Sequence, residues 1–263
     1  MDAPLRLPSL FLSHGSPMLA VEDSPAGRFL DGLGERLGRP RAVVIASAHF
    51  MARQPAVGAD PHPATVHDFN GFPPELYQLR YSAPGEPELA GRVTDLLRDA
   101  GLPARLLPEH GLDHGAWVPL RRMYPQADVP VVPVAVLPQA DARTHLALGR
   151  ALDPLREQGV LVVGSGGFVH NLGDLAWHDP AAAMPDWARE FADWMRARLA
   201  EGDVDALLDW SIRAPHPRRA HPTPEHLLPL FIALGAAGPV PRAETLHASH
   251  EYGSLALDAF AFE

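Results

Sequence analysis

The chain has 263 residues, is 46% hydrophobic and contains no cysteine; it can bury a large core, and disulfides, thiolate metal sites, iron–sulfur clusters and cysteine nucleophiles are all excluded. Its formal net charge of -10, with only 22 basic residues, argues against a nucleic-acid surface and favours a small-molecule ligand. The sequence has no run of about 18 apolar residues that could span a membrane and no secretory leader pattern, so no membrane association and a cytoplasmic location are expected.

Nothing in the sequence marks a domain boundary. There is no linker rich in serine and glycine, no block of like charges and no repeat of solenoid length, and boundaries usually carry such signals. The 29 prolines and 22 glycines interrupt apolar runs one or two at a time, as turns do. Residues 1–263 are therefore expected to form a single domain.

Two short apolar runs near the start of the chain each lead to a histidine. Residues 10–12 run toward His14 and residues 42–46 run toward His49, and both runs predict buried strands. Residues 61–83 carry aromatic residues and prolines without regular periodicity, which predicts a long loop. Loops of this length inside a compact domain are often functional.

Helices and buried strands alternate in the remainder of the chain. Apolar residues at helical spacing predict two helices, over 86–100 and 141–158, and continuous apolar runs predict two strands, over 129–137 and 160–163. The last third predicts two helices and a final strand, over 185–200, 224–234 and 255–262. This alternation indicates an α/β protein, a three-layer α/β/α sandwich with a central, largely parallel or mixed sheet. In such sheets ligands gather outside the carboxyl ends of the strands.

The glycine-rich segment 164–167 does not match a known catalytic loop. A nucleophile elbow around Ser165 would need a glycine where Val163 stands. The segment also lacks the lysine of a phosphate-binding P-loop and the spacing of a dinucleotide-binding turn. We interpret it as flexible backbone that lets His170 approach a metal.

Three histidines, His14, His49 and His170, closely follow strand-like runs, and the chain has 14 histidines in all. An α/β topology would place these three at one edge of the sheet. Any one alone could be a buried histidine bonded to a backbone carbonyl, but the three together favour a metal site. Neutral imidazole binds zinc, and it suits ferrous iron when positions stay open for substrate.

The sequence leaves the roles of two further groups of residues undecided. Pro224 can begin a helix that starts with Glu225 and His226, and His226, His221 or Glu225 could complete a metal shell; an exposed polar turn is the alternative. His114 precedes a helix-like stretch, where it could serve a capping role or hydrogen-bond a substrate, and composition does not choose between the two.

Several blocks together resemble class III extradiol ring-cleavage dioxygenases, and the DOPA-dioxygenase type in particular. In family order they are Ser13-His14-Gly15-Ser16-Pro17-Met18, Ser47-Ala48-His49, His67-Asp68-Phe69-Asn70-Gly71-Phe72-Pro73, Leu112-Asp113-His114-Gly115-Ala116-Trp117-Val118-Pro119-Leu120, Gly164–Asn171 and His221–His226. The resemblance covers nearly the whole chain, and the Leu-Asp-His-Gly-Ala-Trp block is highly specific.

The resemblance implies a role for each of five histidines. His14 and His49 match the family's two metal histidines, and His226 falls where the third ligand is expected. His170 matches an acid/base histidine beside the metal, which in metal-substituted forms itself touches the ion, and His114 matches a histidine that contacts substrate and oxygen.

The third metal ligand differs from that of better known class III enzymes, in which a glutamate completes the site. We assign His226, with Glu225 and His221 as fallback ligands, and this departure leaves Fe(II) and Zn(II) as alternative metals. The loop 67–81 and Trp117 could form the wall of a substrate pocket; the alternative, which is more common for such aromatic residues, is that they belong to the core.

The expected activity is cleavage of a DOPA-like catechol by O2 at a histidine-bound non-haem metal, giving a ring-opened semialdehyde. One rival is a zinc-dependent hydrolase or lyase on the same scaffold. Another is a non-enzymatic interaction protein, against which the retention of all five histidines counts. Oligomeric state is left open, with a homo-oligomer allowed.

Overall fold

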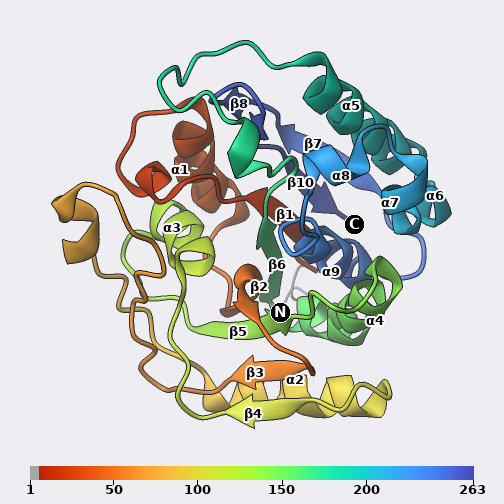
Figure 1. Cartoon of the computed structure of the whole chain (residues 1–263). Coiled ribbons are helices and arrows are strands. Elements are labelled where there is room, and N and C mark those ends of the chain that lie inside the picture. The colour runs from red at the N-terminus through yellow and green to blue at the C-terminus, as the bar shows by residue number, and fades with distance from the viewer. Residues whose placement is uncertain (1–5) are drawn as a thin grey trace.

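A computed structural model describes residues 6–263. Its centre is a mixed sheet of eight strands in the order β4-β3-β5-β2-β6-β1-β10-β7 (Figure 1). In chain order these strands are β1 (Ser9–Ser13), β2 (Ala42–Met51), β3 (Ala56–Gly58), β4 (Arg105–Leu107), β5 (Val131–Val136), β6 (Val160–Gly166), β7 (Ala243–His247) and β10 (Ala259–Phe262). Two short strands, β8 (His250–Glu251) and β9 (Leu255–Ala256), pair with each other outside this sheet.

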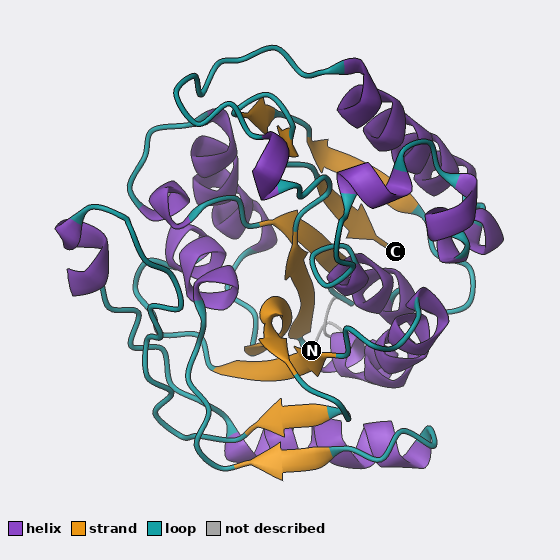
Figure 2. Ribbon diagram, in the orientation of Figure 1, coloured by secondary structure: helices purple, strands orange, loops and turns teal. Residues whose placement is uncertain are grey.

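Helices surround the sheet on both faces (Figure 2). The α-helices are α1 (Pro25–Leu37), α2 (Pro87–Asp99), α3 (His114–Met123), α4 (Ala142–Leu152), α5 (Asp186–Glu201), α6 (Val204–Leu208), α7 (Trp210–Arg213), α8 (Pro217–Ala220) and α9 (Leu228–Ala236). The 3-10 helices are η1 (Pro17–Ala20), η2 (Pro74–Gln78), η3 (Asp153–Gln158) and η4 (Leu172–Asp174). Within residues 6–263, none of these helices combines the length and the apolar character needed to cross a membrane.

The four central strands run parallel. β1 and β2 both pair with β6, and β2 also pairs with β5. Antiparallel pairs lie toward the edges, where β10 joins β1 to β7 and β3 meets β5. The mixed sheet expected from the sequence is thus confirmed, and the carboxyl ends of β1, β2 and β6 meet at one edge.

Side chains alternate between the two faces along each central strand. In β2, Val43 and Ile45 join the apolar cluster that contains α1 and α3. Ala42, Val44 and Ala46 join the cluster on the opposite face, which contains α2, α4, α5 and α9. Both faces are buried, which explains why the strand reads as a continuous apolar run, and the result is the expected three-layer α/β/α arrangement.

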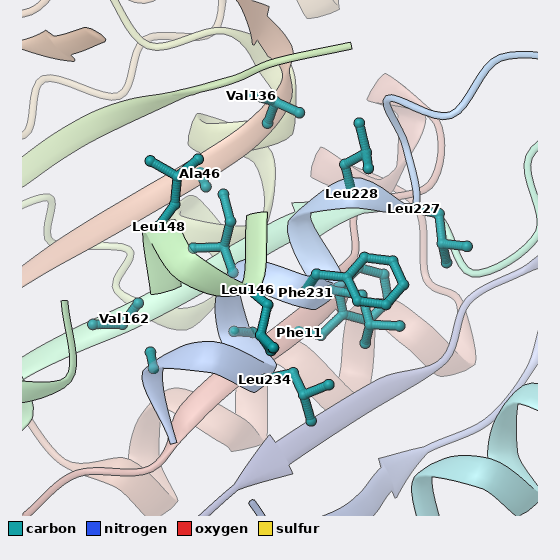
Figure 3. Packing of buried hydrophobic residues seen from close by; sticks show 14 of the residues in the cluster. Phe11, Ala46, Val136, Leu146, Leu148, Val162, Leu227, Leu228, Phe231 and Leu234 are labelled. Atoms are coloured by element: carbon teal, nitrogen blue, oxygen red, sulfur yellow. The ribbon is translucent and has the colours of Figure 1, made fainter. Parts of the chain in front are cut away.

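Helix α9 is the most deeply buried helix of the described chain, since all nine of its residues are buried. It packs beside α4 against the sheet, and Figure 3 shows Phe231 of α9 and Leu146 of α4 next to Phe11 of β1. Gly149 and Gly235 permit close packing, because an added Cβ would lie 2.0 Å from the Ile232 carbonyl oxygen and 2.2 Å from the Leu146 carbonyl oxygen, respectively. This packing fixes the segment that leads into α9.

Two helices differ from the sequence expectation. The helix expected over 141–158 changes at Asp153 from α4 to the 3-10 helix η3, because Pro154 has no N–H to continue the α-helical ladder. The helix expected over 224–234 begins only at Leu228, so Pro224 does not open it. The preceding turn instead directs the His226 carbonyl to the N–H of Gly167, at 2.8 Å.

Strand ends also differ from expectation. The strand expected over 42–46 continues to Met51, so His49 lies inside β2 rather than after it. The pairing with β5 shifts register between Ser47 and Met51, and such irregularities re-aim side chains near functional sites. The strand expected over 255–262 is interrupted and forms β9 and β10.

Candidate metal centre

Three histidines from distant parts of the chain converge at the carboxyl edge of the sheet. His14 follows β1, His49 lies near the end of β2, and His226 lies in the turn before α9. The Nε2 atoms of His14 and His49 are 3.1 Å apart, and those of His49 and His226 are 3.3 Å apart. The three side chains form a group whose ligand atoms all lie within 4.8 Å of one another.

The spacing of these nitrogens fits one metal ion. Imidazole nitrogens bind such ions at about 2.0–2.1 Å, so two ligands at tetrahedral or octahedral angles lie about 3.0–3.4 Å apart. The observed separations of 3.1 and 3.3 Å fall in this range. The cluster is therefore suited to hold one cation between its three side chains.

The outer nitrogen of each imidazole faces an oxygen. Nδ1 of His14 lies 3.1 Å from Ser165 Oγ, whose own proton goes to the Gly115 carbonyl at 2.5 Å; the hydroxyl therefore accepts from His14. Nδ1 of His226 donates to Glu225 Oε1 at 3.0 Å. With protons held on Nδ1, the Nε2 lone pairs of His14 and His226 point inward, as metal ligands require.

Burial keeps the three imidazoles neutral. Desolvation, reinforced by the neighbouring histidines, lowers the pKa of His14 and of His226 well below the usual value. Burial, reinforced by His114, lowers the pKa of His49 to about 3. Neutral imidazole is the form that binds metal, so the site is in its ligand form at neutral pH.

Two glycines of β6 allow the segment with His226 to lie against the sheet. A Cβ at Gly166 would lie 2.0 Å from the His226 carbonyl oxygen, and one at Gly164 would lie 2.1 Å from the Pro229 carbonyl oxygen. These glycines belong to a regular buried strand, so the interpretation of 164–167 as flexible backbone is wrong for Gly164 and Gly166. Their role is close backbone approach.

The other two histidines singled out by the sequence flank the cluster. The His170 ring stacks on that of His226, with centroids 3.4 Å apart and planes 8° apart. The His114 ring lies 3.9 Å from that of His49. All five histidines are thus brought together, and each of them lines the same cavity.

Asp68 connects two of these histidines. Its Oδ2 accepts from Nδ1 of His114 at 3.0 Å and lies 3.4 Å from Nδ1 of His49. Although burial raises the pKa of Asp68, the hydrogen bonds from His114 outweigh that effect and lower this pKa to about 2. The carboxylate is therefore ionised and can orient both imidazoles.

A cavity of about 560 Å³ opens beside the cluster. Besides the histidines it is lined by Asp68, Phe69 and Phe72 of the 61–83 loop and by residues of several other segments, namely Gly15, Ser16, Pro17, Asn171, Leu172, Gly173, Leu175, Trp177, Pro222, Thr223, Glu225, Tyr252 and Leu255. The expectation that this loop walls a pocket is borne out at Phe69 and Phe72. The volume suits one small aromatic molecule.

Two sequence assignments do not match these positions. Trp117 is fully buried, donates its indole N–H to the Val66 carbonyl at 2.9 Å and lies outside the cavity lining; assigning it to the pocket wall is therefore a mistake. The fallback ligand His221 is buried away from the cluster, with Nε2 donating to the Phe168 carbonyl at 3.1 Å. The other fallback ligand, Glu225, lines the cavity, bonds to Nδ1 of His226 and lies within metal-binding reach of His170 and His226.

Sequence reasoning missed the roles of Ser165 and Asp68. The local sequence suggests Ser165 only as a possible nucleophile, because its place behind His14 depends on the parallel pairing of β1 with β6. Asp68 lies in a loop without regular periodicity, so no strand or helix pattern places its side chain. The one feature of the sequence that points to it is an acidic residue among aromatic residues, in a segment too long for a simple connection.

The chain belongs to a known enzyme family. The family model of the catalytic LigB subunit of aromatic ring-opening dioxygenase matches residues 8–258. Accordingly, the protein is a metal-dependent aromatic ring-opening dioxygenase that acts on a small aromatic molecule and O2. The resemblance to class III extradiol enzymes of the DOPA-dioxygenase type is confirmed.

Individual relatives cover almost the whole chain. The 4,5-DOPA dioxygenase extradiol of Beta vulgaris is 41% identical over 97% of this chain and 96% of its own length. The 4,5-DOPA dioxygenase extradiol of Escherichia coli (strain K12) is 43% identical over 88% of this chain and 85% of its own length. The crystal structure of the uncharacterized protein JW3007 from Escherichia coli K12 matches with a TM-score of 0.83 and 36% identity, covering 97% of this chain and 99% of that chain.

Proposed function

We propose that this enzyme cleaves the ring of a DOPA-like catechol in the extradiol position, at a ferrous ion held by His14, His49 and His226. The observation that carries the proposal is the convergence of three inward-facing Nε2 atoms on the floor of a cavity sized for an aromatic ring. The carbon–carbon bond beside the two hydroxyls would break and both atoms of O2 would enter the product. A ring-opened semialdehyde results without an external reductant.

Iron is proposed over zinc on chemical grounds. Bound ferrous iron supplies the redox chemistry that allows O2 to react with a catechol. Zinc has no redox chemistry, so zinc in this site would give an inactive ring-cleavage enzyme. The chain's own contribution is to hold three neutral ligands, leave open positions toward the cavity and exclude water.

His170 is proposed as the base that takes a catechol proton. Its ring lies against that of His226 and lines the cavity. Burial lowers the pKa of His170 to about 4, so the ring is neutral and has a lone pair available at neutral pH. Because the ring lines the cavity, it can accept from the hydroxyl of a substrate bound there.

His114 is proposed as the substrate-contacting residue. Its N–H and Nδ1 are both held by Asp68, at 2.9 and 3.0 Å, which fixes the ring at the cavity wall. A ring fixed in this way can present its remaining nitrogen to the reacting oxygen atoms without reorganisation.

We also propose that residues 1–263 form one catalytic domain, because one sheet carries apolar clusters on both faces.

Anaerobic reconstitution tests the proposal. Apo-protein is loaded with Fe(II) or with Zn(II), and O2 uptake and the visible spectrum are recorded as DOPA is added. The Fe(II) form is expected to consume one O2 per catechol and give a yellow product, while the Zn(II) form and His14→Ala stay inactive. Absence of uptake with any catechol in the Fe(II) form, beside tight zinc retention, would overturn it.

A further inference from the structure

The three proposed metal ligands differ in the group that faces their outer ring nitrogen. Nδ1 of His14 faces an uncharged hydroxyl. Nδ1 of His49 lies 3.4 Å from the Asp68 carboxylate, which is longer than a normal hydrogen bond. Nδ1 of His226 donates to the Glu225 carboxylate at 3.0 Å. Of the three ligands, His226 is therefore the one that makes a full hydrogen bond to a charged acceptor in the described part of the chain.

The Glu225 carboxylate is held in place by its own turn. Its Oε1 also accepts from the Thr223 hydroxyl at 2.9 Å, and prolines at 222 and 224 restrict the backbone around that hydroxyl. The side chains of Glu225 and His226 are 15% and 6% exposed, so solvent screens their interaction little. A hydrogen bond to a carboxylate is stronger than one between neutral groups.

The geometry places Glu225 behind a ligand rather than on the metal. The two nitrogens of an imidazole point in different directions, and Nε2 of His226 faces Nε2 of His49 at 3.3 Å. Glu225 is bonded to the other nitrogen of the His226 ring. It also belongs, with His170 and His226, to a group whose ligand atoms lie within 4.8 Å of one another, so direct binding of Glu225 to a metal is the alternative to exclude.

We propose that Glu225 acts through His226 as the residue that supplies negative charge to the metal site. The inference rests on the proposed function, because it takes His14, His49 and His226 as the ligands. Three neutral imidazoles bring no charge to a divalent ion. A carboxylate bonded to Nδ1 makes Nε2 a stronger electron donor. Glu225 is therefore a positioning residue that strengthens metal binding and lowers the reduction potential of bound iron, which favours electron transfer to O2.

Glu225→Gln tests the proposal, because glutamine keeps an oxygen that can accept from Nδ1 but carries no charge. Zn(II) affinity is measured by competition with a chelating dye. The Fe(III)/Fe(II) midpoint potential is measured by a redox titration followed by the electron paramagnetic resonance of Fe(III). We expect the Kd for Zn(II) to rise about tenfold to a hundredfold. We expect the potential to rise by about 59 mV, which corresponds to a tenfold smaller preference for Fe(III).

Glu190→Gln is the matched control. Glu190 also forms a carboxylate–histidine pair, with Nε2 of His216 at 2.8 Å, but both side chains are exposed and neither lines the cavity. This variant is expected to keep the wild-type affinity and potential. Thr223→Val removes a hydrogen bond from the Glu225 carboxylate but leaves its charge, so the potential is expected to stay unchanged.

A double-mutant cycle separates action through His226 from direct binding of Glu225 to the metal. When Glu225→Gln is added to His226→Ala, we expect Zn(II) affinity to change by no more than about twofold, because the ring that transmits the charge is gone. A further loss of about tenfold in the double variant would mean that Glu225 binds the ion itself. The proposal would then be wrong.

The outcomes separate this inference from the function on which it rests. Wild-type affinity and potential in Glu225→Gln would overturn the inference and leave the three-histidine site standing. Weaker Zn(II) binding without a rise in potential would also contradict it, since Glu225 would then have a packing role alone. If His226→Ala bound Zn(II) as tightly as the wild type, or if the Fe(II) enzyme consumed no O2 with any catechol, the proposed function itself would fail.

Discussion

Asp68 holds His114 from two sides: Oδ1 accepts from the backbone N–H at 2.9 Å and Oδ2 accepts from Nδ1 at 3.0 Å. The same Oδ2 lies 3.4 Å from Nδ1 of His49. One carboxylate of the 61–83 loop therefore orients a proposed metal ligand and a proposed substrate contact together. The loop is part of the site because it supplies this group.

The first prediction is that Asp68→Asn lowers kcat/KM by about tenfold to a hundredfold, the usual effect of removing a group that orients a metal ligand. The amide has one accepting oxygen in place of two and cannot hold both the backbone N–H and Nδ1 of His114. Steady-state O2 uptake measures the loss, and metal content is determined in parallel. Asp23→Asn, at a side chain that is 83% exposed, is the control; equal activity in both variants would contradict the role of Asp68.

Much of the site could be predicted from sequence because its histidines are tied to strand ends. His14 and His49 follow or end buried apolar runs, and parallel strands bring such residues to one edge. The supporting residue Ser165 could not be predicted in this way. It faces His14 only because β1 and β6 are neighbours in the sheet, and local sequence does not encode strand order.

The second prediction concerns that serine. Ser165→Ala removes the hydroxyl that accepts from Nδ1 of His14, so the ring is less firmly held in its ligand tautomer. We expect metal affinity to fall by about tenfold to a hundredfold, measured by competition with a chelating dye and so independently of activity. Ser9→Ala is a matched control, because Ser9 is equally buried and donates to the Ala233 carbonyl at 2.7 Å. A similar loss of affinity in both variants would indicate a general packing effect.

The start of α9 shows where local reasoning fails. Pro224 is a reasonable first residue for a helix, yet the helix begins at Leu228. The reason is tertiary: the His226 carbonyl bonds to Gly167, and Gly166 leaves room for that approach. A contact between residues about 60 apart therefore sets the orientation of the third proposed ligand.

The third prediction follows from this contact. Gly166→Ala would place a Cβ 2.0 Å from the His226 carbonyl oxygen, and backbone must move to relieve the overlap. We expect a loss of about 1–3 kcal/mol in the free energy of unfolding, with weaker metal binding because His226 is displaced. Urea unfolding and the chelator competition measure the two effects.

A glycine in an open helical position provides the contrast. A Cβ at Gly91 in α2 has no neighbour within 4 Å, so Gly91→Ala is expected to stabilise the fold by about 0.5–1 kcal/mol through helix propensity. Metal binding should stay unchanged. If Gly166→Ala proved as well tolerated as Gly91→Ala, close approach would not be the reason for the glycine in β6.

The last prediction concerns acid stability and His221, which is buried outside the metal cluster. Burial lowers the pKa of His221 to about 3, whereas the imidazole in the unfolded chain titrates near 6.5. Between these two values the unfolded state binds one proton more than the folded state, so stability falls as the pH falls from about 6.5 toward 3. His221 alone is expected to contribute a loss of about 1.4 kcal/mol per pH unit in this window.

His221→Gln isolates this contribution, since the amide can still donate to the Phe168 carbonyl but does not titrate. Urea unfolding of the metal-free protein between pH 7 and pH 5 should show a smaller loss of stability in the variant, by about 2 kcal/mol over these two pH units, because the unfolded imidazole titrates within this window. His178→Gln, at an exposed histidine, controls for removal of one imidazole and should retain the wild-type slope. The other buried histidines act in the same direction, so the variant keeps part of the acid sensitivity. Parallel wild-type and His221→Gln curves would mean that His221 becomes protonated in the folded state without cost, and its burial would then have to be relieved by local opening.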